Sequence, residues 1–239
     1  MRASSSSLGT FALHIRVGTL SISSPSLLNC KEVLVVYSRR MIREVVIDIE
    51  TKKSFEEVGG QEHLDKLGVS VVGAYFYEDN SYCAYEEHEI SLFEERLMRC
   101  DRIIGFNINH FDIPVLLPYF RGEWINEFPR LDLLQEVAKK LGHRISLDSL
   151  ASATLNAKKS GNGLQALAWY KEGKIDLIKK YCLDDVRITK ELYEYGKKNQ
   201  KLFYTSYFKT EKLTVATEWG DTIQRAGGGV AIGFQGRLL

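Results

Sequence analysis

The sequence predicts an α/β fold: a mixed β-sheet, with an antiparallel three-stranded meander plus parallel strands, flanked by α-helices. Three observations lead to this fold class. The chain has 239 residues, of which 44% are hydrophobic and 26% charged, as in an ordinary globular domain. Its first half alternates short β-branched runs with turn residues, and its second half carries apolar residues at helical spacing. Such an order of elements suggests one layered domain.

Short runs rich in β-branched and aromatic residues predict the strands. In chain order they cover 44–50, 68–77, 81–85, 102–106 and 130–133. Because Glu78-Asp79-Asn80 separates the second run from the third, these two strands form an antiparallel hairpin. The first strand completes the meander, and the later ones follow helices, as parallel strands do.

Apolar residues repeating every three or four positions predict the helices. These segments cover 91–100, 111–120, 134–141, 147–155, 164–171 and 175–198. A strand-like run over 212–217 and a Gly-rich tail follow.

The first 40 residues differ in composition from the remainder. They hold five basic residues, one acid and nine serines, which leaves a net charge of −3 on the rest of the chain. This composition resembles that of an organelle transit peptide, but Met41 stands directly before the first strand. We expect a disordered leader or gene-model extension over 1–40, a domain over 41–204, and a C-terminal strand with a Gly-rich tail over 205–239. We expect a cytoplasmic location, or an organellar one if the leader is a transit peptide.

The composition also excludes several kinds of protein. With 32 basic and 31 acidic residues, the chain cannot hold nucleic acid by bulk charge. The four cysteines form no CxxC or Cys/His cluster, which argues against a disulfide framework and a zinc site. No apolar run approaches the roughly 20 residues needed to cross a bilayer, so we expect no membrane partner.

Three separated segments carry acidic residues that could do chemistry. Side chains alternate along a strand, so Asp48 and Glu50 share one face at the end of the first strand. Asp112 lies in the first turn of a helix, where an acid often only complements the helix dipole. Tyr181 and Asp185 are four residues apart, which places them on one face of the long helix.

A fold that brought these carboxylates together would need cations. Two carboxylates about 4 Å apart repel by roughly 4 kcal/mol at an effective dielectric constant near 20. Oxygen ligands select Mg²⁺ or Mn²⁺, and two such ions can clamp the attacking and leaving oxygens of a phosphodiester.

Three segments resemble the motifs of a known enzyme family. They are Asp48-Ile49-Glu50-Thr51, the stretch from Gly105 to Pro114, and Tyr181-Cys182-Leu183-Asp184-Asp185. Together they resemble the three exonuclease motifs of the DnaQ-like 3′–5′ exonucleases, in the tyrosine (DEDDy) subgroup. The chain is similar over about 45–193 to stand-alone YprB-like ribonuclease H-like proteins and to the proofreading domain of family B DNA polymerases.

The resemblance implies an RNase H-like fold and metal-dependent 3′–5′ exonuclease activity on single-stranded DNA or RNA. It implies five catalytic residues, namely Asp48, Glu50, Asp112, Tyr181 and Asp185. The four carboxylates would hold two Mg²⁺ or Mn²⁺ ions, and Tyr181 would orient or deprotonate the attacking water. We expect substrate contacts from Thr51, Phe106, Asn107, Lys158 and Lys159. Further candidate cations for the substrate are Lys139, Lys140, Arg144, Lys171 and Lys174.

Two other functions stay open at this stage. One is a nucleic-acid-binding module within a repair, helicase or polymerase-associated assembly, because a fold alone does not imply activity. The other is an endonuclease of the RNase H type, because the same metal site can serve internal cleavage. The sequence leaves the choice between DNA and RNA open, together with the preferred ion and the oligomeric state.

Overall fold

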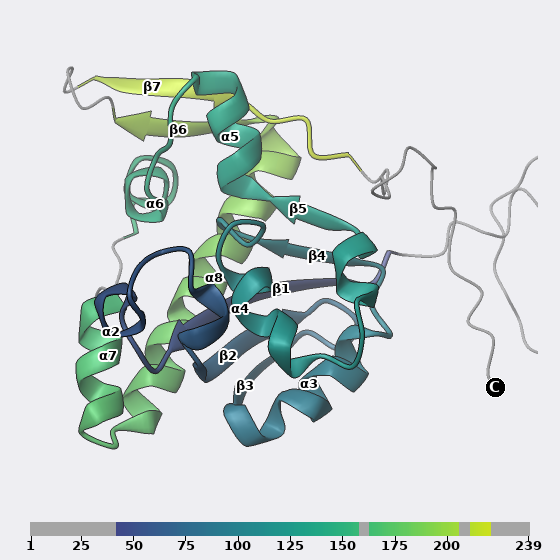
Figure 1. Cartoon of the computed structure of the whole chain (residues 1–239). Coiled ribbons are helices and arrows are strands. Elements are labelled where there is room, and N and C mark those ends of the chain that lie inside the picture. Colours follow the sequence, from purple (N-terminus) through teal and green to yellow (C-terminus); the bar gives the residue numbers. More distant parts are fainter. Residues whose placement is uncertain (1–41, 158–162, 206–210, 221–239) are drawn as a thin grey trace, which may run out of the picture. The chain divides into compact units, whose positions relative to one another are not determined.

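A five-stranded mixed sheet is the central layer of the structure, a computed structural model that describes residues 42–157, 163–205 and 211–220. The strand order is β3-β2-β1-β4-β5 (Figure 1). Pairing is antiparallel between β1, β2 and β3, and parallel between β1, β4 and β5. The strands are β1 (Glu44–Thr51), β2 (Val69–Phe76), β3 (Ser81–Glu86), β4 (Arg102–Gly105) and β5 (Arg130–Asp132). This arrangement confirms the predicted fold class.

Helices and a second, two-stranded sheet surround this layer. The α-helices are α2 (Phe55–Val58), α3 (Ile90–Leu97), α4 (Asp112–Leu116), α5 (Leu133–Leu141), α6 (Leu147–Leu155), α7 (Gly163–Lys171) and α8 (Ile175–Asn199). The 3₁₀ turns are η1 (Leu64–Lys66), η2 (Glu87–Glu89), η3 (Leu117–Tyr119) and η4 (Trp124–Glu127). The second sheet pairs β6 (Lys201–Thr205) with β7 (Lys212–Ala216).

Three elements differ from the sequence-based expectation. The helix expected over 111–120 ends as an α-helix at Leu116, because Pro118 has no N–H to continue the hydrogen-bond ladder. The short elements α2 and β6 were not predicted. The expected leader and the Gly-rich tail lie outside the described residues, which all belong to the unit Met41–Leu239. Within the described ranges, no helix is both long and apolar enough to span a membrane.

The side chains on the two faces of β1 pack into two different hydrophobic cores. Val45, Ile47 and Ile49 pack into a core with residues of α3 and α4. Val46 packs into the core on the opposite face, which α5, α6 and α8 cover. Because side chains alternate along a strand, Asp48 and Glu50 share the Val46 face, on the side of α8.

A glycine in β2 lets α8 lie close to the sheet. Gly73 pairs with Asp48 in the register of β1 and β2. A Cβ atom at Gly73 would lie 2.8 Å from Sγ of Cys182 and 3.1 Å from Cγ2 of Val186, both on α8. These separations are shorter than van der Waals contact, so only glycine permits this spacing between helix and sheet.

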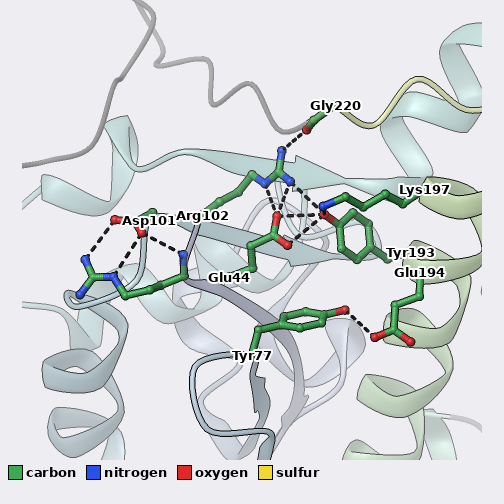
Figure 2. Close-up of polar contacts among 9 residues, drawn as sticks. Glu44, Tyr77, Asp101, Arg102, Tyr193, Glu194, Lys197 and Gly220 are labelled. Atoms are coloured by element: carbon green, nitrogen blue, oxygen red, sulfur yellow. Dashed lines mark hydrogen bonds and ion pairs between the residues drawn. The ribbon is translucent and has the colours of Figure 1, made fainter. Parts of the chain in front are cut away.

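A buried ion pair joins the N-terminal ends of β1 and β4 to each other and to α8 (Figure 2). The guanidinium of Arg102 donates to the carboxylate of Glu44, with Nε 2.9 Å from Oε1, and to the hydroxyl of Tyr193 at 3.0 Å. The Tyr193 hydroxyl lies 2.9 and 3.0 Å from the two Glu44 oxygens. Nη1 of Arg102 also donates to the carbonyl of Gly220 at 3.0 Å, which ties down the segment after β7. All three side chains are buried.

We expect Arg102→Met to lower the free energy of unfolding by about 3–5 kcal/mol, because it leaves the Glu44 carboxylate buried without its cation. Urea denaturation measures this loss. The control is Arg187→Met. Arg187 forms an ion pair with Glu191 on α8, and the two side chains are 41% and 38% exposed, so this pair should contribute less than about 0.5 kcal/mol to the free energy of unfolding. Equal losses in the two variants would contradict the role of the buried pair.

Candidate metal centre

Three carboxylates converge where the C-terminal end of β1 meets α8. Asp48, Glu50 and Asp185 each place one oxygen within 4.8 Å of the others. Glu50 and Asp185 are buried and Asp48 is half-buried. Carboxylates this close repel one another strongly when they are shielded from water, so a cation or protons must offset their charge. A donor set made only of oxygen atoms fits a hard divalent cation such as Mg²⁺ or Mn²⁺.

Tyr181 stands beside this group on the same face of α8 as Asp185. Its hydroxyl hydrogen-bonds to the Asp185 carboxylate, and its ring is packed edge-on by Trp169, with the ring centroids 6.2 Å apart. Burial, followed by the charges of the nearby carboxylates, raises the pKa of Tyr181 above its ordinary value. The phenol is therefore neutral at physiological pH and acts as a hydrogen-bond donor.

Asp112 lies apart from the group of three. It begins α4, on the other face of the sheet, and its carboxylate accepts a hydrogen bond from the backbone N–H of Ile49. Ile49 stands between Asp48 and Glu50, so Asp112 reaches the edge of β1 at the same level as the other acids. Burial, and secondarily the charge of Asp132, raises the pKa of Asp112 to about 7.

Cys182 is a contact of the site that the sequence reasoning missed. Its Sγ lies 3.3 Å from the backbone oxygen of Asp48 and 3.6 Å from Oδ2 of the same residue. Burial and the neighbouring carboxylates raise the pKa of Cys182 well above its ordinary value, so the neutral thiol donates to Asp48. The available signal was Gly73, an isolated glycine inside an apolar strand, which often marks a close approach.

The expected substrate residues lie in different environments. Thr51 ends β1, and its Oγ1 donates to the backbone oxygen of Lys53 at 3.0 Å. Phe106 is half-buried against the core on the α8 side. Asn107 has a left-handed backbone with φ 70°, and its Oδ1 accepts a hydrogen bond from Nη2 of Arg144 at 2.8 Å. Lys158 and Lys159 lie outside the described residues.

Four of the further candidate cations already have carboxylate partners. Each of these lysines forms an ion pair between 2.6 and 3.2 Å long. The pairs are Lys139–Glu136, Lys140–Glu218, Lys171–Glu57 and Lys174–Glu172. A phosphate would have to compete with these acids, whereas Arg144 donates a hydrogen bond to the neutral side-chain amide of Asn107.

The raised pKa of Asp112 should make the stability of the metal-free protein depend on pH. A carboxyl group whose pKa is raised by folding stabilises the folded state while protonated, and this contribution is lost as the pH rises from about 4 to about 7. In thermal melts with chelator, we expect the melting temperature of wild type to fall by several degrees relative to Asp112→Asn across this range, and to level off above it.

The control for this pH dependence is Glu136→Gln, which removes an exposed acid that pairs with Lys139. Its melting temperature should follow that of the wild type at every pH. A difference between wild type and Asp112→Asn that stays constant with pH would contradict the assignment.

Comparison with known proteins places the chain in a family. Residues 45–196 match the family described as the RNase_H superfamily. The structure is similar to the family B DNA polymerase from the hyperthermophilic archaeon Pyrobaculum calidifontis, with a TM-score of 0.50 and 18% identity. The likeness covers 65% of this chain and 24% of the polymerase chain, and at this identity it shows the fold alone. No curated protein matches the chain. Because the family match covers well over half of its residues, this protein belongs to the RNase_H superfamily.

Proposed function

We propose that the protein is a metal-dependent 3′–5′ exonuclease of the DnaQ-like DEDDy subgroup, acting on single-stranded DNA or RNA. The convergence of Asp48, Glu50 and Asp185, with the hydroxyl of Tyr181 on Asp185, is the observation that carries this proposal. Membership of the RNase_H superfamily supports phosphodiester hydrolysis. The 3′–5′ polarity is proposed from the resemblance of the three motifs. The catalytic domain is proposed to span 41–204.

The proposed roles follow from where each side chain lies. Asp48, Glu50 and Asp185 would hold one divalent cation, and Asp112 together with Asp48 would hold a second. Bound Mg²⁺ or Mn²⁺ ions would neutralise charge on the phosphodiester and supply a nucleophilic water. The hydroxyl of Tyr181, which hydrogen-bonds to Asp185, is proposed to orient or deprotonate that water.

Substrate binding in this proposal depends on local contacts, because the chain after its first 40 residues has a net charge of −3. Arg144, from the connection between α5 and α6, donates a hydrogen bond to the side chain of Asn107, which lies on the segment that leads to Asp112. These two residues are proposed to contact the sugar-phosphate backbone of the nucleic-acid substrate beside the scissile phosphate. Thr51, Phe106, Lys158 and Lys159 are proposed as further substrate contacts.

Digestion of a 5′-labelled single-stranded oligonucleotide with Mg²⁺ or Mn²⁺ tests the activity. We expect a ladder that shortens from the 3′ end and stops when chelator is added. Asp48→Asn and Asp185→Asn should each lower kcat/KM by roughly 10³-fold, because a lost metal ligand removes several kcal/mol of transition-state stabilisation.

Asp184→Asn is the matched control, since Asp184 is next in sequence and faces Arg187 at 3.7 Å instead of the carboxylate group. It should keep wild-type activity. Hydrolysis that survives excess chelator, or an equal loss in Asp184→Asn and Asp185→Asn, would contradict the proposed site. Cuts within a circular single strand or inside an RNA–DNA hybrid would favour the endonuclease, and binding without hydrolysis would favour the binding module.

Tyr181→Phe should lower kcat by about 10²-fold and leave Mn²⁺ affinity unchanged, because the hydroxyl positions the water without being a metal ligand. Single-turnover kinetics and Mn²⁺ titration measure the two effects separately. Tyr82→Phe, at a 41% exposed tyrosine of β3, is the control and should behave as wild type. Full activity of Tyr181→Phe would remove Tyr181 from the mechanism.

A further inference from the structure

Asp132 is a buried acid that is not one of the proposed metal ligands. It is 3% exposed and forms the N-cap of α5, where its Oδ1 accepts the backbone N–H of Gln135 at 3.1 Å. The same oxygen accepts the N–H of Asn107 at 2.9 Å, and Oδ2 accepts the N–H of Asn109 at 3.0 Å. One carboxylate therefore caps a helix and also binds two amides of the β4–α4 loop, defined as residues 106–111.

The β4–α4 loop is a tight turn that ends at Asp112. Asn107 has φ 70°, and its carbonyl accepts the N–H groups of His110 and Phe111 at 3.2 and 3.1 Å. Ile108 is fully buried and lies against Gly105, where a Cβ atom would be only 2.2 Å from Cγ2 of Ile108. The loop therefore has little freedom while its amides are bound, and any shift in it moves Asp112.

Removing the carboxylate would release this turn. The N–H groups of Asn107 and Asn109 donate to the same carboxylate, and leaving amides of a partly buried turn without an acceptor destabilises that turn. A rearranged turn that rebinds them, or a water that enters, would displace the start of α4. Asp112 would then no longer accept the hydrogen bond from the N–H of Ile49, and its distance from the other acids would change.

We propose that Asp132 is a positioning residue, which holds the β4–α4 loop so that Asp112 can complete a second divalent-cation site beside Asp48. Its predicted effect on hydrolysis rests on the proposed function. Its effects on the loop and on cation binding do not, so the proposal can be tested without nuclease activity.

The two tasks of Asp132 can be separated by substitution. Serine is as good an N-cap as aspartate, so Asp132→Ser should keep the cap on α5 while it loses the second oxygen and the reach to the loop. Asp132→Asn can keep a carbonyl oxygen at the Oδ1 position, which retains the bonds from Asn107 and Gln135 and loses the one from Asn109. Ser146→Ala is the control, because it removes the N-cap of α6, where Oγ of Ser146 accepts the N–H of Ser149.

Amide hydrogen exchange and Mn²⁺ titration of the purified full chain test the proposal, with Asp112→Asn as the reference for loss of the second cation. We expect Asp132→Ser to speed exchange of the Asn107 and Asn109 amides and to weaken Mn²⁺ binding at least about tenfold, with the same loss of stoichiometry as Asp112→Asn. Asp132→Asn should fall between Asp132→Ser and wild type. Ser146→Ala should lose stability and keep wild-type Mn²⁺ binding.

In nuclease assays, Asp132→Ser and Asp132→Asn should lower kcat more than they raise KM. Wild-type Mn²⁺ binding and loop exchange in Asp132→Ser would overturn the proposal, and so would wild-type binding in Asp112→Asn. If Asp132→Ser does not fold, the intermediate Mn²⁺ affinity of Asp132→Asn decides the question. An inactive wild type whose Mn²⁺ binding still depends on Asp132 would contradict the proposed function while supporting the positioning role.

Discussion

The close packing of α8 across β1 and β2 is the constraint on which the rest of the structure depends. Asp48 and Glu50 are brought near Asp185 only because the helix lies against the sheet at the level of Gly73, where any side chain would collide with Cys182 and Val186. At its other end, α8 is held by the hydrogen bonds of Tyr193 to Glu44 and Arg102, buried between β1 and β4. The helix is thus fixed to the sheet at two levels along its length.

This packing also creates the electrostatic problem that a metal would solve. Two buried acids and one half-buried acid meet at the end of β1, and their charges add to burial in raising the pKa of Cys182. On a solvent-exposed surface, water would screen the repulsion between such carboxylates. At a buried site, the same repulsion opposes folding. Holding these carboxylates together therefore lowers the stability of the folded state, and such a local cost is typical of a functional site.

Asp112 shows how a second element extends the same site. It comes from α4, on the opposite face of the sheet, and reaches the edge of β1 through the N–H of Ile49. It follows the turn after β4, whose Asn107 and Asn109 amides donate to Asp132 at the end of the neighbouring strand β5. The two proposed cation positions would thus depend on different parts of the fold, one on α8 and one on the β4–α4 loop.

Local periodicity predicted the parts of the site that lie within one element. Strand alternation predicted the shared face of Asp48 and Glu50, and helical spacing predicted the contact of Tyr181 with Asp185. The meander, the parallel strands and the long helices followed from the same patterns. The contact of Cys182 with Asp48 and the role of Asp132 could not be predicted, because their partners lie 134 and 23–25 residues away along the chain. The helix α2 has four residues, about one turn, which is too short to show a helical period, and β6 follows α8 directly and is defined by its pairing with β7, which its own five residues do not reveal.

The central claim is that Asp48, Glu50 and Asp185 form a divalent-cation site. Anomalous X-ray diffraction from crystals grown with Mn²⁺ tests it most directly, because the anomalous signal locates the ion without reference to activity. The account predicts a Mn²⁺ peak within coordination distance of oxygens from all three side chains, and no such peak in Asp185→Asn. A wild-type crystal with the three carboxylates in place and no Mn²⁺ between them would contradict it.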